Sequence, residues 1–130
     1  MTYEIPFNMY YANRSGSWDN KGVSFLDISA PGKAYGVAYL ISREQFDHIY
    51  KEENGGIIPK NTSTWYNKII TLGNLDGIDV MTFTNSKVLE KNLPSKCYLN
   101  VLAEGLRENY PHLDENEIWS YLLPEGVCVL

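Results

Sequence analysis

The chain has 130 residues, of which 44% are hydrophobic and 13% aromatic, enough for one domain built around one hydrophobic core. Its formal net charge is −5 and it has no cluster of Lys and Arg to neutralise phosphates, so we expect no nucleic-acid partner. We also expect no membrane partner, because no apolar run approaches the roughly 18 residues of a bilayer-spanning helix. The first residues lack the basic start and apolar run of a signal peptide.

Alternating apolar and polar residues predict strands in the first third of the chain. Apolar side chains at every second position predict a strand over residues 2–12, in which Pro6 marks an edge position or a bulge. Residues 13–22 are rich in turn formers and predict a loop. The apolar segments 23–29 and 34–42 predict two strands that form a hairpin across the intervening APGK sequence.

Capping signals predict three helices in the rest of the chain. Ser42 and Gln45 fit a capping box, which predicts a helix that runs to about Glu53 and ends at the glycines that follow. Ser95 predicts the start of a second helix. The DENE sequence at residues 114–117 fits another capping box and predicts a third, short helix.

The remaining segments predict strands. Residues 65–73 and 78–84 predict a hairpin with its turn at residues 74–77, and the apolar tail, residues 126–130, predicts a terminal strand. Together the elements predict one α+β domain over residues 1–130. We expect it to contain a small mixed β-sheet or barrel of about five strands, with packed helices.

Glu53 is the acid that falls on the apolar stripe of the first predicted helix. Phe46, Ile49 and Tyr50 are spaced like residues that a helix turns toward a core, and Glu53 has the next position of that stripe. Because burying an unpaired carboxylate is costly, one interpretation is a general acid or base at a cleft. The other is an ordinary carboxylate in the last turn that points into solvent.

The two cysteines, Cys97 and Cys128, are too few for a disulfide framework or a metal site of familiar spacing. Reduced thiols are usual in the cytoplasm, so we expect a cytoplasmic protein with two free thiols and no metal or cofactor. Cys97 is followed by apolar positions of the second predicted helix, which is typical of a thiol in the core.

Several segments, taken in order, resemble the γ-glutamylcyclotransferase-like family. They are residues 13–18 with Gly22-Val23, the YGVAYLI sequence at 35–41, residues 43–54, Tyr66, and residues 94–109. The resemblance covers residues 7–123. In that family the final turn of a helix supplies one essential glutamate, and an aromatic residue on the next strand lines the same cavity. The resemblance implies that Glu53 is that glutamate and Tyr66 that aromatic residue, with Tyr11 and Trp18 in the cavity wall.

The resemblance also implies a reaction. In that family the glutamate takes a proton from the α-amino group of a small γ-glutamyl compound. The amine then attacks the γ-carbonyl and releases 5-oxoproline together with an amine or amino acid. An ammonium ion cannot attack, so such a reaction requires a base.

The chain departs from the family pattern at its N-terminal end. The family has a Tyr-Gly-Ser-Asn-type loop whose backbone N–H groups bind the substrate carboxylate, and the YANRS sequence at residues 11–15 lies one strand too late to be its equivalent. Two interpretations therefore stay open, an enzyme of this type and a non-catalytic small-molecule-binding or protein-interaction module. The missing strand leaves a sheet edge unpaired, which predicts a homodimer through that edge.

Overall fold

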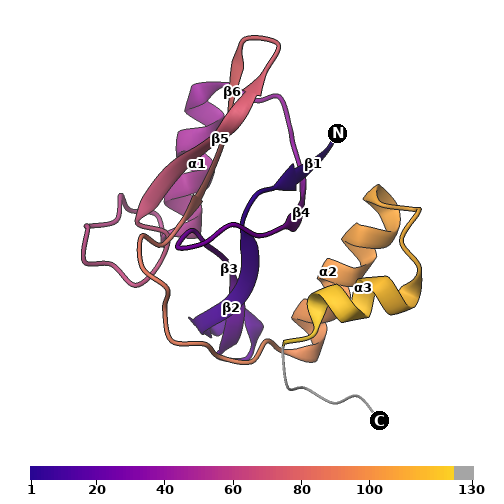
Figure 1. Ribbon diagram of the computed structural model, residues 1–130. Coiled ribbons are helices and arrows are strands. Elements are labelled where there is room, and N and C mark those ends of the chain that lie inside the picture. Colours follow the sequence, from indigo (N-terminus) through magenta and orange to yellow (C-terminus); the bar gives the residue numbers. More distant parts are fainter. Residues whose placement is uncertain (125–130) are drawn as a thin grey trace.

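The computed structural model describes residues 1–124, and within them the protein is an α+β protein with three α-helices and six strands (Figure 1). In chain order the elements are β1 (Thr2–Ile5), β2 (Asn8–Ser15), η1 (Gly16–Trp18, one 3₁₀ turn), β3 (Lys21–Asp27), β4 (Ala34–Val37), α1 (Arg43–Glu53), β5 (Lys68–Leu75), β6 (Ile78–Thr84), α2 (Lys96–Asn109) and α3 (Glu115–Leu122). The terminal strand expected at residues 126–130 lies outside the described residues.

The strands form three separate antiparallel pairs, β1–β4, β2–β3 and β5–β6. They do not close into a barrel within residues 1–124, and no mixed sheet is formed there, so this part of the expectation is wrong. β6 is joined to β3 through the side chain of Thr84, which forms hydrogen bonds with the β3 backbone. The Thr84 hydroxyl accepts a hydrogen bond from the Leu26 N–H (3.0 Å) and donates one to the Leu26 carbonyl (2.9 Å).

Strand pairing in the first third of the chain differs from the expected hairpin. β3 pairs with β2, not with β4, and β4 pairs with β1. The physical reason lies at Pro6, which has no N–H to donate and divides the expected strand over residues 2–12 into β1 and β2. The APGK segment folds back onto this break, where the Gly32 N–H donates to the Pro6 carbonyl at 3.0 Å.

The expected strand over residues 34–42 is also shorter than predicted. β4 ends at Val37. Ala38 still exchanges hydrogen bonds with Met1, and the apolar residues 39–41 leave the β1–β4 pair. Tyr39 and Leu40 are 75% and 83% exposed, and Ile41 is 38% exposed. The apolar character of this segment therefore does not report burial within the described chain.

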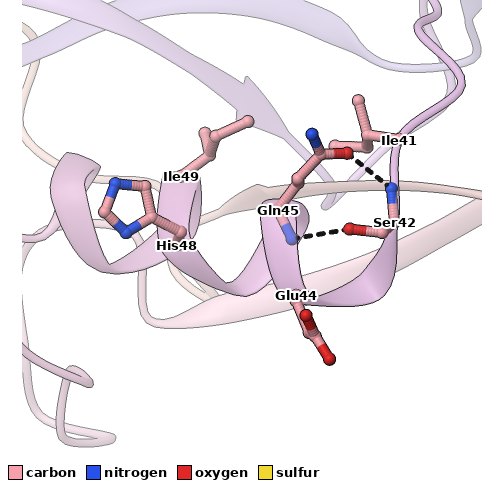
Figure 2. A pocket seen from close by; sticks show the side chains of 6 residues that line it. All are labelled: Ile41, Ser42, Glu44, Gln45, His48 and Ile49. Atoms are coloured by element: carbon pink, nitrogen blue, oxygen red, sulfur yellow. Dashed lines mark hydrogen bonds between the residues drawn. The ribbon is translucent and has the colours of Figure 1, made fainter.

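The capping box at the start of α1 is confirmed (Figure 2). The Gln45 N–H donates to the Ser42 hydroxyl at 3.1 Å, and the Ser42 N–H donates to the Gln45 side-chain oxygen at 2.9 Å. At the other end Gly55 and Gly56 have φ of 75° and 85°, the left-handed region that glycine adopts freely. α1 lies beside the β5–β6 hairpin, where Tyr50 packs on Phe83 with ring centroids 5.2 Å apart (Figure 1).

The β5–β6 hairpin is confirmed, with β6 at the expected residues 78–84 and β5 displaced along the sequence. β5 begins at Lys68 rather than at Trp65, and the tight turn is Asp76-Gly77, both with positive φ. Trp65 and Tyr66 therefore lie in the segment before the strand. This displacement is important for the site, because that segment packs against β3 while β5 continues along α1 (Figure 1).

α2 and α3 form a helical pair, and the side-chain caps expected at Ser95 and Asp114 are both present. One core cluster lies between these helices and includes Leu106, Ile118 and Leu122. The expectation of a core thiol is wrong, because Cys97 is exposed in the first turn of α2. Within residues 1–124 no helix has the length and apolar character of a membrane-crossing segment.

A second core cluster lies on the β2–β3 pair. Its buried members are Tyr10, Ala12, Val23 and Phe25, and the segment that contains Trp65 and Tyr66 packs against it. Because side chains alternate along a strand, Tyr11 faces away from Tyr10, toward the helices. The two clusters therefore lie on opposite faces of β2.

Candidate functional site

A cleft of about 680 Å³ lies where the end of α1 meets η1, the end of the β2–β3 pair and the start of α2. Two carboxylates and four aromatic rings are the chemically notable groups that line it. These are Glu52, Glu53, Trp18, Trp65, Tyr66 and Tyr98. The other lining residues are small or polar, apart from Val23, and include Ser15, Ser17 and Asn54.

A bulge in β2 brings η1 to this cleft. Between Ala12 and Ser15 the register shifts, and Asn13 adopts a φ of 64°. The bulge is fixed from two sides, since the Asn13 side chain donates to the Thr64 carbonyl and its own carbonyl accepts from the Asn92 side chain at 2.8 Å. As a result Trp18 and its neighbours are held next to the segment that precedes β5.

Asn54 joins the end of α1 to that same segment. Its side-chain nitrogen donates to the carbonyls of Tyr50 (2.9 Å) and Tyr66 (3.2 Å), and its side-chain oxygen accepts from the Tyr66 N–H (3.0 Å). The amide thus pairs with both backbone groups of Tyr66, as a neighbouring strand would do. Glu53, the preceding residue, is thereby placed at the same cleft as Tyr66.

Asn85 supports the segment from the other side. Its side chain is almost completely buried, with 1% of the residue exposed, and donates to the carbonyls of Ser63 (2.9 Å) and Trp65 (2.6 Å). Its side-chain oxygen accepts from the Lys87 N–H at 3.0 Å. Because a buried amide without partners would be costly, these bonds hold the segment in one place.

Ser24 of β3 anchors two of the rings. Its carbonyl accepts from the Tyr66 hydroxyl at 3.0 Å, and its side chain accepts from the Tyr98 hydroxyl at 3.0 Å. Burial raises the pKa of the Tyr66 hydroxyl, and the neighbouring Tyr98 and the negative charge of Glu53 raise it further. The field of Glu53 therefore extends to the ring of Tyr66, consistent with their shared cleft.

The structure brings three of the four expected site residues together. Glu53, Tyr66 and Trp18 come from separate segments and line one cleft. Glu53 is exposed in the last turn of α1, as the interpretation of an ordinary carboxylate expected, and it also lines the cleft. The Tyr66 hydroxyl donates to the Ser24 carbonyl.

Tyr11 is the expected residue that does not line the cleft. It is 6% exposed, and its hydroxyl donates to the Leu122 carbonyl at 2.6 Å. Its ring meets the ring of Tyr98 edge-on, with centroids 6.3 Å apart. Tyr11 therefore supports a wall residue of the cleft and attaches α3 to β2.

A second hollow, of about 730 Å³, lies at the start of α1 (Figure 2). It is lined by Ile41, Ser42, Glu44, Gln45, His48 and Ile49. The side chains of Glu44 and His48 project from different parts of the helix in Figure 2 and do not converge. The hollow is mainly the surface around the capping box, and it contains none of the expected site residues.

Sequence reasoning missed several residues that build the main cleft. Glu52, Asn54 and Tyr98 all line the cleft, and no motif in the sequence distinguishes them from ordinary helix residues. No periodicity reports that an asparagine will pair with a distant backbone, so no sequence signal was available for Asn54 or Asn85.

Within residues 1–124 no group of three or more His, Cys, Asp or Glu side chains is arranged to hold a metal ion. Comparisons of this protein with family models, with curated proteins and with solved structures find no match.

Proposed function

We propose that this protein is a γ-glutamylcyclotransferase-like enzyme that converts a γ-glutamyl amine or peptide to 5-oxoproline, with Glu53 as general base. The observation that carries the proposal is the meeting of Glu53, Tyr66 and Trp18 at one cleft, since they come from three separate segments of the chain. The sequence resemblance selected these residues without knowledge of their positions in space.

The chemistry fits the groups that line the cleft. The Glu53 carboxylate takes a proton from the α-ammonium group, and the resulting amine attacks the γ-carbonyl carbon to form the lactam C–N bond. The C–N bond to the departing amine then breaks as Glu53 returns its proton to that nitrogen, which leaves as the free amine and restores the Glu53 carboxylate. Ser15 and Ser17 line the same cleft and can donate hydrogen bonds to the carbonyl oxygen as its negative charge develops.

The test is the release of 5-oxoproline from γ-glutamyl amides by the wild-type chain and by Glu53→Gln. Losing a general base typically slows such a step by about a hundredfold or more. The matched control is Glu44→Gln, which removes the same charge from the first turn of the same helix, outside the cleft. Equal turnover by Glu53→Gln and the wild type would exclude Glu53 as the base.

A second candidate is a non-catalytic module that binds a small molecule in the same cleft. Two observations favour it. Glu53 is exposed, and the residues that line the cleft include no Lys or Arg to hold the carboxylate of a γ-glutamyl substrate. Such a module would be stabilised by a ligand in a thermal melt and would release no 5-oxoproline.

The proposal includes a homodimer through the segment that follows β4. Tyr39, Leu40 and Ile41 are exposed, and within the described residues their backbone N–H and C=O groups make no hydrogen bonds. An extended apolar segment with free backbone groups is suited to pair with a second copy. The expected molar mass is twice that of one chain, and Leu40→Lys should yield the monomer in light scattering.

The proposal also includes the cytoplasm as the location of the protein. Cys97 is an exposed free thiol, which a reducing compartment preserves. Cell fractionation tests this.

A further inference from the structure

The charged residues that line the cleft indicate the charge of a ligand that would bind there. Glu52 and Glu53 supply two carboxylates, and the residues that line the cleft include no Lys, Arg or His to neutralise them. Arg14, the nearest basic residue along the chain to the η1 side of the cleft, is exposed and does not line it. The lining of the cleft therefore carries two acidic side chains and no basic one.

The aromatic residues that line the cleft are a second, independent feature. Trp18, Trp65, Tyr66 and Tyr98 line the cleft, and the rings of Trp18 and Tyr98 meet edge-on with centroids 5.1 Å apart. The face of an aromatic ring carries negative potential and attracts a cation within about 6 Å of its centre. Rings together with carboxylates thus favour a cation that is itself partly apolar.

We propose that the cleft binds small organic ammonium ions and that Glu53 and Trp18 are the principal groups that select for their positive charge. This inference deepens the proposed function, because it rests on the same cleft and names the charge of the compound bound there. It concerns binding, so it does not require that the cyclisation occurs. For a γ-glutamyl compound, it predicts that the preferred compounds carry a cationic amine part and that those with an additional carboxylate are disfavoured.

The test compares two ligands of the same shape, choline, which carries a quaternary ammonium group, and 3,3-dimethylbutan-1-ol, in which carbon replaces the charged nitrogen. Binding of both to the full chain is measured by titration calorimetry. We expect choline to bind about tenfold or more tightly than the neutral alcohol, the ratio that about 1.4 kcal/mol provides. Equal affinities, or no binding of choline, would overturn the inference.

Variants assign the effect to the cleft. Glu53→Gln and Trp18→Leu should each weaken choline binding by about fivefold or more, whereas Glu44→Gln, with the same change of net charge, should leave it unchanged. Leu keeps much of the apolar volume of Trp18 without its π face, and circular dichroism verifies that each variant is folded. Equal weakening by Glu44→Gln would mean a general charge effect and would refute the assignment.

Failure of this inference and failure of the proposed reaction give different results. If choline binds selectively but no γ-glutamyl compound yields 5-oxoproline, the inference holds and the reaction is wrong. If 5-oxoproline forms equally well from compounds with cationic and with anionic amine parts, the reaction holds and the inference is overturned.

Discussion

At the scale of single residues, asparagine side chains connect separate segments of the chain by hydrogen bonds to their backbone. A carboxamide has a donor and an acceptor on one rigid group, so it can replace the backbone of a missing strand neighbour. Asn54 pairs with both backbone groups of Tyr66, and Asn85 binds the carbonyls of Ser63 and Trp65. The segment that precedes β5 is thus held without belonging to a strand, and two rings of the cleft depend on it.

Asn54→Ala should therefore be more destabilising than a similar substitution at a helix end that has only local bonds. Asn109, the last residue of α2, provides the matched control, because its side chain also donates to the carbonyl four residues earlier, at 2.9 Å in both cases. Asn109→Ala loses that bond alone, whereas Asn54→Ala also loses two bonds to Tyr66. We expect a difference of about 1–2 kcal/mol in the free energy of unfolding, measured with urea. Equal losses in the two variants would show that the bonds to Tyr66 contribute nothing.

Helical periodicity places Glu53 on the apolar stripe of α1 but does not decide whether that position is buried or exposed. Tyr50, on the apolar stripe of α1, is buried. Burial does not extend along the whole stripe, because Ile49 is 43% exposed and Glu53 is exposed. The spacing of apolar residues shows which face of a helix a residue lies on. The length of that face that is buried depends on the element that packs against it. Phe83 of β6 contacts Phe46 and Tyr50 and provides that partner.

Single side chains also connect elements. Thr84 ends β6, is fully buried, and binds both backbone groups of Leu26. This contact is one way in which the β5–β6 hairpin is attached to the β2–β3 pair, and stacking of Tyr66 on Phe25, with ring centroids 4.5 Å apart, is another. The cleft lies near this junction, so its shape depends on the attachment.

Thr84→Val keeps the size and branching of the side chain and removes its hydroxyl. Both backbone groups of Leu26 then lose their partner, and we expect the free energy of unfolding to fall by about 2 kcal/mol. Thr71→Val provides the control, because Thr71 is exposed on β5 and should change stability by less than about 0.5 kcal/mol. Similar stabilities for the two variants in urea titrations would contradict this role for Thr84.

The elements that the sequence predicted correctly are those fixed by residues close together in the sequence. Both capping boxes, the Ser95 cap and the hairpin turn near residue 76 depend on neighbours a few positions away. Strand pairing depends on residues far along the chain, and both strands that follow the first loop were assigned the wrong partner. Pro6 indicates a bulge or an edge position, but no residue near it in the sequence shows that β1 pairs with β4.

At the scale of the whole molecule, tyrosine hydroxyls connect distant parts of the chain. Tyr11 binds the Leu122 carbonyl, Tyr66 binds that of Ser24, and Tyr110 binds that of Gly36 at 2.6 Å. Each of these bonds joins a different pair of elements or segments. Because the donor must be the neutral phenol, the assembly of the fold depends on protonated tyrosines.

This dependence predicts a loss of stability in alkaline solution. Burial raises the pKa of five tyrosine hydroxyls above the ordinary value of 10, those of Tyr10, Tyr11, Tyr50, Tyr66 and Tyr121. In the unfolded chain these groups ionise near pH 10, whereas in the folded chain they keep their protons to higher pH. The folded state therefore binds more protons above about pH 10, so the stabilisation is complete below that pH and declines as the pH rises further.

The measurement is the free energy of unfolding in urea at pH values from about 8 to 11, together with the ultraviolet titration of tyrosine. We expect stability to be level up to about pH 10 and then to fall with increasing slope. Tyr66→Phe removes one of the raised groups, so its decline should be shallower than that of the wild type, although the variant is less stable at neutral pH through loss of the bond to Ser24. A stability that stays level through about pH 11 would show that the tyrosines ionise equally in the folded and unfolded chain, and the proposed coupling of ionisation to folding would be wrong.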